Sequence, residues 1–581
     1  MTNASWTEDF EARLRQHLTF LYPDHDPAQL ADRIRPVLEE TDLTSTDALW
    51  SEEDTLLITY GDSIRASAET PLKTLLEFLN TRLDKEISTV HILPFCPFSS
   101  DDGFAVIDYL EVNPDLGDWN DISAVGERYK LMADLVINHV SSESDWFKNY
   151  CEGKSPGSDY FVEACATDDL SAVVRPRTTP LLRPTQTKDG VKHLWCTFSH
   201  DQIDLNFRNP DVLIEFLRVV VAYLEKGVRW IRLDAVGFLW KEPGTTSLHL
   251  PQTHEAVRLF RTVLDQFAPG TILLTETNVP NHENLSYFGN RNEAHMIYNF
   301  SLAPLLVHAL LAGNSAYLKQ WMMSMPPAPL CCTYLNFTAS HDGIGMRPAE
   351  GLLSEEEQIQ MVETVQQFGG RVSTRRGAGG SEHIYELNIS LFDALRGTFE
   401  GEDEYQVERF LCSQTVMMAV EGIPAFYIHS LLATPNDLEG IERTGHNRSI
   451  NRHKWDYELL TKQLDDPTSK HAIVFNELKR RIALRQGQPA FHPNATQFTL
   501  QLSDCFFAFW RQSKDRSQSI FVVSNLTSIP QELPLQELNL IALDDWCDAL
   551  SGQRIEDRSG SIRVEPYQCL WITNRLPSVA D

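Results

Sequence analysis

The chain has 581 residues, of which 42% are hydrophobic and 23% charged, so it is long enough for a large core and for more than one domain. The net charge of −31 disfavours binding to nucleic acid or to an anionic membrane, and no apolar run is long enough to span a bilayer. The first residues resemble an amphipathic helix rather than a signal peptide, which predicts a cytoplasmic protein with an N-terminal helical extension over residues 1–50.

Eight short apolar runs follow one another along the chain, with helical patterns such as residues 211–227 and 253–267 between them. Fully apolar runs of this length are typical of strands buried on both faces of a parallel sheet. The runs cover residues 56–60, 90–95, 131–138, 228–235, 271–276, 295–300, 333–337 and 423–428. Eight strand–helix units predict an α/β fold, a (β/α)₈ TIM barrel, built from residues 51–140 and 206–485.

Two insertions interrupt the strand–helix pattern. Residues 141–205, an inserted domain B, contain RPRTTPLLRP, and a second insertion over residues 346–400 contains RRGAGGSEH. Long loops in compact domains are usually functional. After about residue 485 the pattern changes to short strands such as residues 505–512, 519–526 and 568–574, which predicts a C-terminal antiparallel β domain over residues 486–581.

Polar residues gather at the ends of the predicted strands. In a barrel the carboxyl ends of the strands form one rim, and active sites lie there. A single polar residue after a strand is as often a cap, but most of these strands end in this way. The residues are Tyr60, Asp62, Asp101, Asn138, His139, Arg232, Asp234, Glu276, Asn299, His341 and Asp342.

Three carboxylates at these ends fit glycosidic chemistry. Arg232 and Asp234 are two positions apart, so on a strand they face the same side, and the cation would keep a nucleophilic aspartate ionised. Glu276 ends the next run, and adjacent strands would bring it within the ~5–5.5 Å of Asp234 that retention requires. It would then need a raised pKa to act as the acid. The alternative is that these two and Asp342 are unrelated surface carboxylates.

Four segments at barrel spacing resemble the motifs of glycoside hydrolase family 13, the α-amylase family. They are DLVINH (134–139), WIRLDAVGF (230–238), LLTETN (273–278) and ASHDGIG (339–345). The resemblance implies that Asp234 is the nucleophile, Glu276 the general acid/base and Asp342 the carboxylate that stabilises the transition state. It also implies glucosyl-binding roles for His139, Arg232 and His341.

Other strings are similar to the sucrose phosphorylase branch of this family: SSDDGFAVIDY (99–109), TFSHDQIDLN (197–206), MRPAEGLL (346–353) and GHNRSINRH (445–453). The chain also lacks the Lys-His that usually follows the nucleophile in the hydrolysing amylases. The resemblance implies further glucosyl contacts from Asp101 and Arg448. It implies apolar walls from Phe104, Phe198 and Phe238, although buried aromatic residues are more often plain core.

A phosphorylase must bind a phosphate dianion beside its carboxylates, and guanidinium groups bind phosphate bidentately. The first insertion supplies Arg175, Arg177 and Arg183. By resemblance to the RPRPG loop of the sucrose-active relatives, Arg177 matches a phosphate-binding arginine. The alternative for these arginines is solvated loop charge.

The acceptor side differs from that of the sucrose phosphorylases. Val174, Asn278 and Tyr385-Glu386 stand where those enzymes have tyrosine, histidine and Tyr-Gln. Four strings resemble instead the glucosylglycerate phosphorylases of the same branch: DLSAVVRPRTTPLL (169–182), HLWCTFSHDQIDLNFRNP (193–210), TETNVPNHENLSYFG (275–289) and NEAHMIYNFSLAPL (292–305).

This resemblance implies reversible phosphorolysis of 2-O-α-D-glucosyl-D-glycerate, with phosphate or acceptor contacts from Arg175, Arg177, Asn278, Tyr385 and Glu386. Glu386 would repel a carboxylate unless it is protonated or paired. The alternatives are a sucrose or sucrose 6′-phosphate phosphorylase, an α-glucoside hydrolase or isomerase, and a non-catalytic barrel subunit.

The expected partners are a small carbohydrate and phosphate, with no nucleic acid and no membrane. No Zn-type Cys/His spacing and no EF-hand loop occurs, so no metal is expected. No cofactor is expected either, because phosphate is a co-substrate. The ten cysteines form no CxxC pair, which is typical of reduced structural thiols. We expect a monomer or a homodimer.

Overall fold

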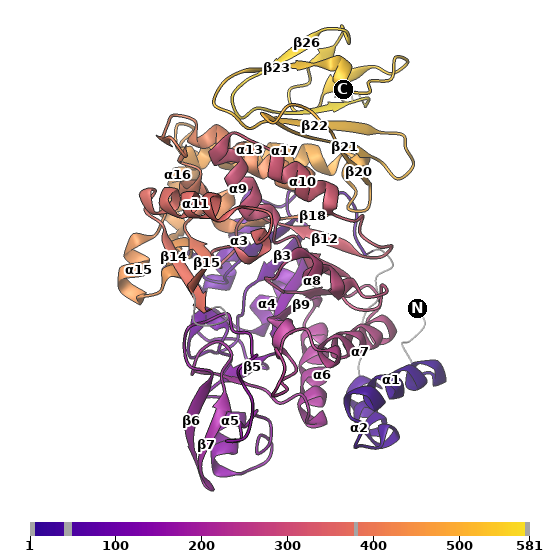
Figure 1. Ribbon diagram of the computed structural model, residues 1–581, viewed down its shortest axis with the longest axis vertical. Helices are drawn as coiled ribbons and strands as arrows, with labels where there is room; N and C mark the ends of the chain where they lie inside the picture. Colours follow the sequence, from indigo (N-terminus) through magenta and orange to yellow (C-terminus); the bar gives the residue numbers. More distant parts are fainter. Residues whose placement is uncertain (1–5, 40–48, 377–381, 576–581) are drawn as a thin grey trace.

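The computed structural model describes residues 6–39, 49–376 and 382–575, and its centre is a closed barrel of eight strands (Figure 1). All neighbouring barrel strands are parallel, in the order β1-β18-β12-β11-β10-β9-β4-β3. They are β1 (Leu56–Thr59), β3 (Thr89–Ile92), β4 (Lys130–Val136), β9 (Val228–Asp234), β10 (Ile272–Thr275), β11 (Met296–Tyr298), β12 (Thr333–Asn336) and β18 (Ile423–Tyr427). Each overlaps one of the eight apolar runs, and the (β/α)₈ prediction is confirmed.

Helices cover the outside of the barrel and bury the outward faces of its strands. Their main members are α3 (Pro71–Arg82), α4 (Trp119–Arg128), α6 (Pro210–Glu225), α7 (Pro251–Phe267), α8 (Asn281–Leu285), α9 (Leu302–Ala312), α10 (Ala316–Ser324), α13 (Gln406–Ala419) and α17 (Lys470–Gln486). The start of α6 follows from its sequence, since Asn209 caps the helix and Pro210 occupies its first turn. Strands that are enclosed on both faces are apolar along their whole length. In β10, for example, all four residues are buried.

The N-terminal extension packs on the outside of the barrel. Helix α1 (Glu8–Leu21) lies against α7, and α2 (Pro27–Glu39) lies against α6 (Figure 1). Phe10 meets Phe267 edge to face with ring centroids 5.1 Å apart, and His17 contacts Glu255 at 2.6 Å. Apolar packing and polar pairing therefore both hold this extension against the barrel.

The first insertion is tied to the barrel by a short ladder between β5 (His139–Ser141) and β8 (Gln202–Asp204). Between these strands lie α5 (Asp145–Glu152) and the hairpin of β6 (Leu182–Thr187) and β7 (Gly190–Trp195), seen at the bottom of Figure 1. His139 begins β5, so the ladder holds a predicted site residue at the rim.

The second insertion forms an antiparallel sheet in the order β13-β15-β14. Its elements are β13 (Ile344–Gly345), α11 (Glu355–Gln367), β14 (Arg371–Arg376) and β15 (Glu382–Asn388). The glycine-rich stretch predicted here lies mostly outside the described residues. After β18 come α15 (Leu438–Thr444) and α16 (Tyr457–Asp465), and the chain segment between these two helices carries Arg448.

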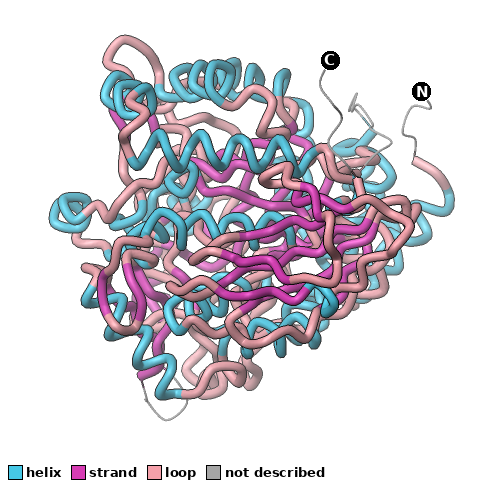
Figure 2. Tube along the Cα trace, turned by 90° about the horizontal axis from the view of Figure 1, so that it is seen from above, coloured by secondary structure: helices cyan, strands magenta, loops and turns pink. Residues whose placement is uncertain are grey.

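The C-terminal part is an antiparallel sheet in the order β20-β21-β22-β27-β24-β25. Its strands are β20 (Thr496–Thr499), β21 (Phe506–Gln512), β22 (Ser519–Asn525), β24 (Trp546–Asp548), β25 (Arg554–Ile555) and β27 (Cys569–Thr573), with a second ladder of β23 (Gln531–Pro534) and β26 (Ser561–Val564). The sheet sits at the top of Figure 1 beside α13, and in the view from above its strands run across the molecule (Figure 2).

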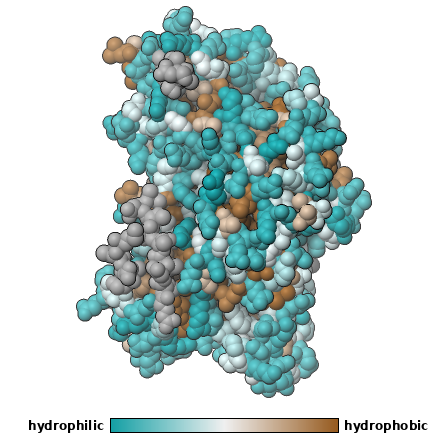
Figure 3. Space-filling model, turned by 180° about the vertical axis from the view of Figure 1, so that it is seen from behind, coloured by the Kyte–Doolittle hydropathy of each residue, from teal (hydrophilic) through white to brown (hydrophobic). Residues whose placement is uncertain are grey.

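The face of the molecule seen in Figure 3 is mainly polar. On the face in Figure 3, hydrophobic residues occur in small separate groups among hydrophilic ones, in keeping with the net charge of −31. Within residues 6–39, 49–376 and 382–575, no helix combines the length and the apolar character needed to cross a bilayer.

Candidate active site

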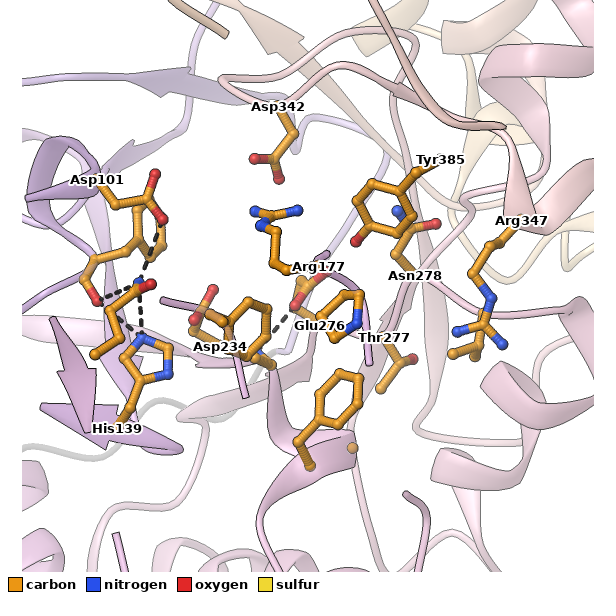
Figure 4. Close-up of a pocket in the computed structure, with 18 of the residues that line it drawn as sticks. Asp101, His139, Arg177, Asp234, Glu276, Thr277, Asn278, Asp342, Arg347 and Tyr385 are labelled. Carbon is orange, nitrogen blue, oxygen red and sulfur yellow. Dashed lines mark hydrogen bonds between the residues drawn. The ribbon is translucent and has the colours of Figure 1, made fainter. Parts of the chain in front are cut away.

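A pocket that opens to solvent lies at the carboxyl ends of the barrel strands (Figure 4). Both insertions contribute to its wall. Fifteen of the sixteen predicted site residues line it: Asp101, Phe104, His139, Arg177, Phe198, Arg232, Asp234, Phe238, Glu276, Asn278, His341, Asp342, Tyr385, Glu386 and Arg448. Arg175 is absent from this wall.

The end of β9 places Arg232 and Asp234 as the alternation of side chains on a strand requires. Arg232 is 3% exposed and donates to Asp234 Oδ1 at 2.7 Å and to Asp134. His91 also contacts Asp134, at 2.7 Å, and the pKa of Asp134 is lowered to about 2 because its interactions with His91 and Arg232 outweigh the effect of its burial. Asp134 therefore fixes the guanidinium that faces Asp234.

A strained turn directly after Asp234 connects the two principal carboxyls. Ala235 has φ +48°, a left-handed conformation that costs free energy in a residue with a side chain. In this conformation the Ala235 N–H donates to Glu276 Oε2 at 2.9 Å (Figure 4). The backbone next to Asp234 thus holds the Glu276 carboxyl beside it.

Burial raises the pKa of Glu276, and the negative charge of Asp342 adds to the effect. Burial likewise raises the pKa of Asp234, and Glu276 raises it further. Two adjacent buried carboxyls favour a state with one proton between them. The ion pair with Arg232 favours the anion on Asp234, which leaves the proton on Glu276.

At one end of the pocket, Asp101 stands in a turn with an unusual backbone. Asp101 and Asp102 have φ of +54° and +48°, and Gly103 has φ +112°. A Cβ at Gly103 would lie 2.7 Å from the Pro94 carbonyl oxygen, so this position requires glycine. The turn directs Asp101 towards the side of the pocket that holds His139 (Figure 4).

His139 is neutral in this environment. Burial lowers its pKa to about 4. The Asn138 amide lies 3.1 Å from Nδ1 and the Phe104 carbonyl lies 2.8 Å from Nε2, so we assign the proton to Nε2. His341 also has a lowered pKa because it is buried, and its ring stacks on Phe104 at 4.9 Å and 6°. The two rings give this end an apolar wall.

Arg448 joins the third carboxylate to the second insertion. Its Nη1 lies 2.6 Å from Asp342, while its Nη2 and Nε contact the two oxygens of Glu386 at 2.5 and 3.1 Å. Although burial opposes ionisation, Arg448 keeps the pKa of Asp342 below its usual value. Glu386 is therefore paired, which answers the question of repulsion that the sequence left open.

Two arginines of the RPR segment have different surroundings. Arg177 enters the pocket and lies over the rings of Phe198 and Tyr385, at 5.8 and 5.5 Å. Arg175 donates to the carbonyl of Thr179 and, at 3.4 Å, to that of Cys196. The structure therefore does not support the prediction that Arg175 binds phosphate or acceptor, since its guanidinium braces the loop. Arg183 similarly donates to the His200 carbonyl at 2.7 Å.

Several lining residues had no predicted role: Pro176, Gln202, Ala235, Gly237, Leu248, His249, Thr277, Val279 and Arg347. Gln202 and Arg347 lie inside strings that carried the family resemblance, TFSHDQIDLN and MRPAEGLL, so a signal for them existed. His249 reaches the pocket through a loop after β9, and nothing in its local sequence indicated this.

The barrel and the paired carboxyls at adjacent strand ends define a glycoside-acting barrel enzyme, and comparisons with known proteins agree. Residues 84–328 match the family model of the α-amylase catalytic domain. The glucosylglycerate phosphorylase of Escherichia coli (strain K12) is 41% identical over 90% of this chain and 92% of its own length. That of Allomeiothermus silvanus is 40% identical over 98% of this chain and 100% of its own length.

Among solved structures, the sucrose 6F-phosphate phosphorylase from Thermoanaerobacter thermosaccharolyticum superposes with a TM-score of 0.71 at 25% identity, over 82% of this chain and 94% of that one. The chain belongs to glycoside hydrolase family 13, the α-amylase family, in the branch of the glucosylglycerate and sucrose phosphorylases.

In the part of the chain that the structure describes, no group of three or more His, Cys, Asp or Glu side chains is arranged to hold a metal ion.

Proposed function

We propose that the protein catalyses reversible phosphorolysis of 2-O-α-D-glucosyl-D-glycerate to α-D-glucose 1-phosphate and D-glycerate, with retention at the anomeric carbon. One observation carries the proposal. The pocket combines a nucleophile–acid carboxyl pair with a guanidinium, Arg177, that contacts aromatic rings and, within the described part of the chain, forms no ion pair with a carboxylate. Relatives named for this activity are 40–41% identical over 90% or more of the chain.

In the first step an Asp234 oxygen attacks the anomeric carbon while the bond to the glycerate oxygen breaks. Glu276 gives its proton to that departing oxygen and becomes a carboxylate. The product on the enzyme is a glucosyl ester of Asp234. Asp342, kept ionised by Arg448, stabilises the positive charge that develops on the sugar ring.

In the second step a phosphate oxygen attacks the same carbon, and the bond to Asp234 breaks. Glu276 accepts the proton of the attacking phosphate hydroxyl, which returns both carboxyls to their starting state. Two inversions give net retention. Arg177 would hold the anion, since guanidinium groups bind phosphate through paired hydrogen bonds. Phosphate is thus a co-substrate, and the scheme needs no cofactor or metal.

Neutral His139 and the Phe104–His341 stack suit the glucosyl end, where they would pack against an uncharged ring. Asp101, at the same end, would accept hydrogen bonds from sugar hydroxyls. We propose the cytoplasm as the site of this reaction. The oligomeric state, monomer or homodimer, remains part of the proposal.

A sucrose or sucrose 6F-phosphate phosphorylase is the second candidate, because the solved structure of such an enzyme superposes on this chain. The deciding experiment incubates the purified protein and phosphate with glucosylglycerate, sucrose or sucrose 6′-phosphate and measures glucose 1-phosphate. We expect the fastest release from glucosylglycerate. Faster release of glucose 1-phosphate from either sucrose compound would show that glycerate is not the preferred acceptor. The proposed two-step mechanism would be unaffected.

The pH dependence follows from the raised pKa of Glu276. Its protonated form is the acid in the first step, so kcat/KM for glucosylglycerate should fall as pH rises through that pKa. α-Glucosyl fluoride needs no proton from Glu276 to release fluoride, so its profile should lack this basic limb. Both substrates need ionised Asp234 and should share the acid limb. An identical basic limb for both substrates would contradict the acid role of Glu276.

A further inference from the structure

Four arginines line the pocket, and they differ in what neutralises them. Arg232 is bound by Asp134 and Asp234, and Arg448 by Asp342 and Glu386. For Arg177 and Arg347, no ion pair with a carboxylate occurs among the described residues. Two cations are thus left for ligands, and the proposed reaction uses two anions, phosphate and glycerate.

Arg347 stands at the opposite end of the pocket from Asp101 and His139. Figure 4 shows it on the side of Thr277, Asn278 and Tyr385. The glucosyl ring would occupy the end with Asp101, and the anomeric carbon would lie near Asp234. The Arg347 end is therefore where the part of the substrate beyond the glycosidic oxygen lies.

The backbone fixes Arg347 in this position. It begins a short 3₁₀ turn, Arg347–Ala349, directly after β13. The Met346 N–H donates to the Tyr385 carbonyl at 2.9 Å, and the Ser301 hydroxyl donates to the Pro348 carbonyl at 3.0 Å. Arg347 thus follows the sheet that carries Tyr385 into the wall, and the fixed backbone sets the side from which its side chain enters the pocket.

Arg347 supplies the positive charge at its end of the pocket. The nearby His249 is neutral, because burial and then the charges of His254 and Arg347 lower its pKa to about 4. The Nε of Arg347 and the Asn278 Oδ1 are buried without a hydrogen-bond partner. A ligand with a carboxylate next to a hydroxyl group would satisfy both atoms. The carboxylate would accept from the guanidinium, and the hydroxyl would donate to the amide oxygen.

Close packing also holds Asn278 beside this turn. A Cβ at Gly345 would lie 2.8 Å from the Asn278 amide nitrogen and oxygen. Glycine at this position therefore lets β13 pass directly over the amide. Asn278 and Arg347 are thus held on one wall by the same strand and its following turn.

We propose that Arg347 binds the carboxylate of D-glycerate and sets the acceptor specificity, while Arg177 serves phosphate at the reacting carbon. This inference rests on the proposed function. We assign the two roles from the positions of the two arginines. Arg177 lies near the catalytic carboxylates, since its charge helps to lower the pKa of Asp342. Arg347 lies beyond them, by Asn278 and Tyr385.

The test runs the reaction from glucose 1-phosphate and compares two acceptors, D-glycerate and glycerol, which replaces the carboxylate by a CH₂OH group. Arg347→Met should raise the KM for glycerate roughly tenfold to a hundredfold, the loss expected for a charge-assisted hydrogen-bond pair. The KM for glycerol should change less than about threefold, because glycerol has no charge for Arg347 to bind. Arg347→Lys should recover part of the preference, since a lysine keeps the charge without the fork.

Arg371→Met is the matched control, because this exposed arginine lies in the same insertion and donates to the carbonyls of Gly369 and Gly370. This variant should leave the KM for both acceptors unchanged. Thermal unfolding should show that all variants are folded. An unchanged preference for glycerate over glycerol in folded Arg347→Met would overturn the inference. If the wild-type protein transfers no glucose to glycerate, the proposed function fails instead.

Discussion

Asp234→Asn should lower kcat by about 10⁶-fold, the order of loss seen when the nucleophile of a covalent-intermediate enzyme is removed. Asparagine keeps the size and a hydrogen bond to Arg232, but its amide does not form the ester with the anomeric carbon. The measurement is the release of glucose 1-phosphate at saturating glucosylglycerate and phosphate. Although Asp234 is only 7% exposed, the change is nearly isosteric and Asp134 still neutralises Arg232, so we expect the fold to survive.

Glu276→Gln separates the role of the nucleophile from that of the acid. This variant should lose activity on glucosylglycerate, whose leaving group needs a proton, yet still react with α-glucosyl fluoride. Asp234→Asn should fail with both substrates. If Asp234→Asn retained a tenth or more of the wild-type kcat, the covalent mechanism would be wrong.

The second large effect concerns phosphate. Arg177→Ala should lower kcat/KM for phosphate by about a hundredfold, because an anion next to ionised Asp342 would lose its counter-charge. The KM for glucosylglycerate in the first step should change less. Water should then compete better for the glucosyl-enzyme, so the fraction of product released as free glucose should rise.

Arg175→Ala is the comparison for Arg177→Ala, since it lies two residues away and braces the loop through the carbonyls of Thr179 and Cys196. The Arg175→Ala substitution should lower the melting temperature. It should also weaken the use of phosphate and of glucosylglycerate, measured as kcat/KM, by similar factors. A selective loss of phosphate binding in Arg175→Ala, with Arg177→Ala unaffected, would reverse the assignment of these two arginines.

The barrel could be predicted because its strands are buried on both faces. Each had to be a short apolar run, and the helices between them left a 3.6-residue period. The position of the site followed as well, since the carboxyl ends of parallel strands meet at one rim. Asp234 ends β9, Glu276 directly follows the neighbouring β10, and the two residues come together there.

The loops were harder to predict, because a local sequence does not determine which way a loop side chain turns. Arg175 and Arg177 stand in one RPR segment, yet one points to loop carbonyls and the other into the pocket. Arg347 lies inside a string that indicated the family, but only the turn after β13 shows that it reaches the wall. The pairing of Glu386 with Arg448 joins residues 62 positions apart and has no local pattern.

The most direct test of the central claim is to trap the glucosyl ester. Glu276→Gln treated with α-glucosyl fluoride should gain the mass of one glucosyl group, and peptide mapping should place it on Asp234. Added phosphate should then remove the label as α-D-glucose 1-phosphate. A label on another residue, or its release chiefly as free glucose in the presence of phosphate, would contradict the account.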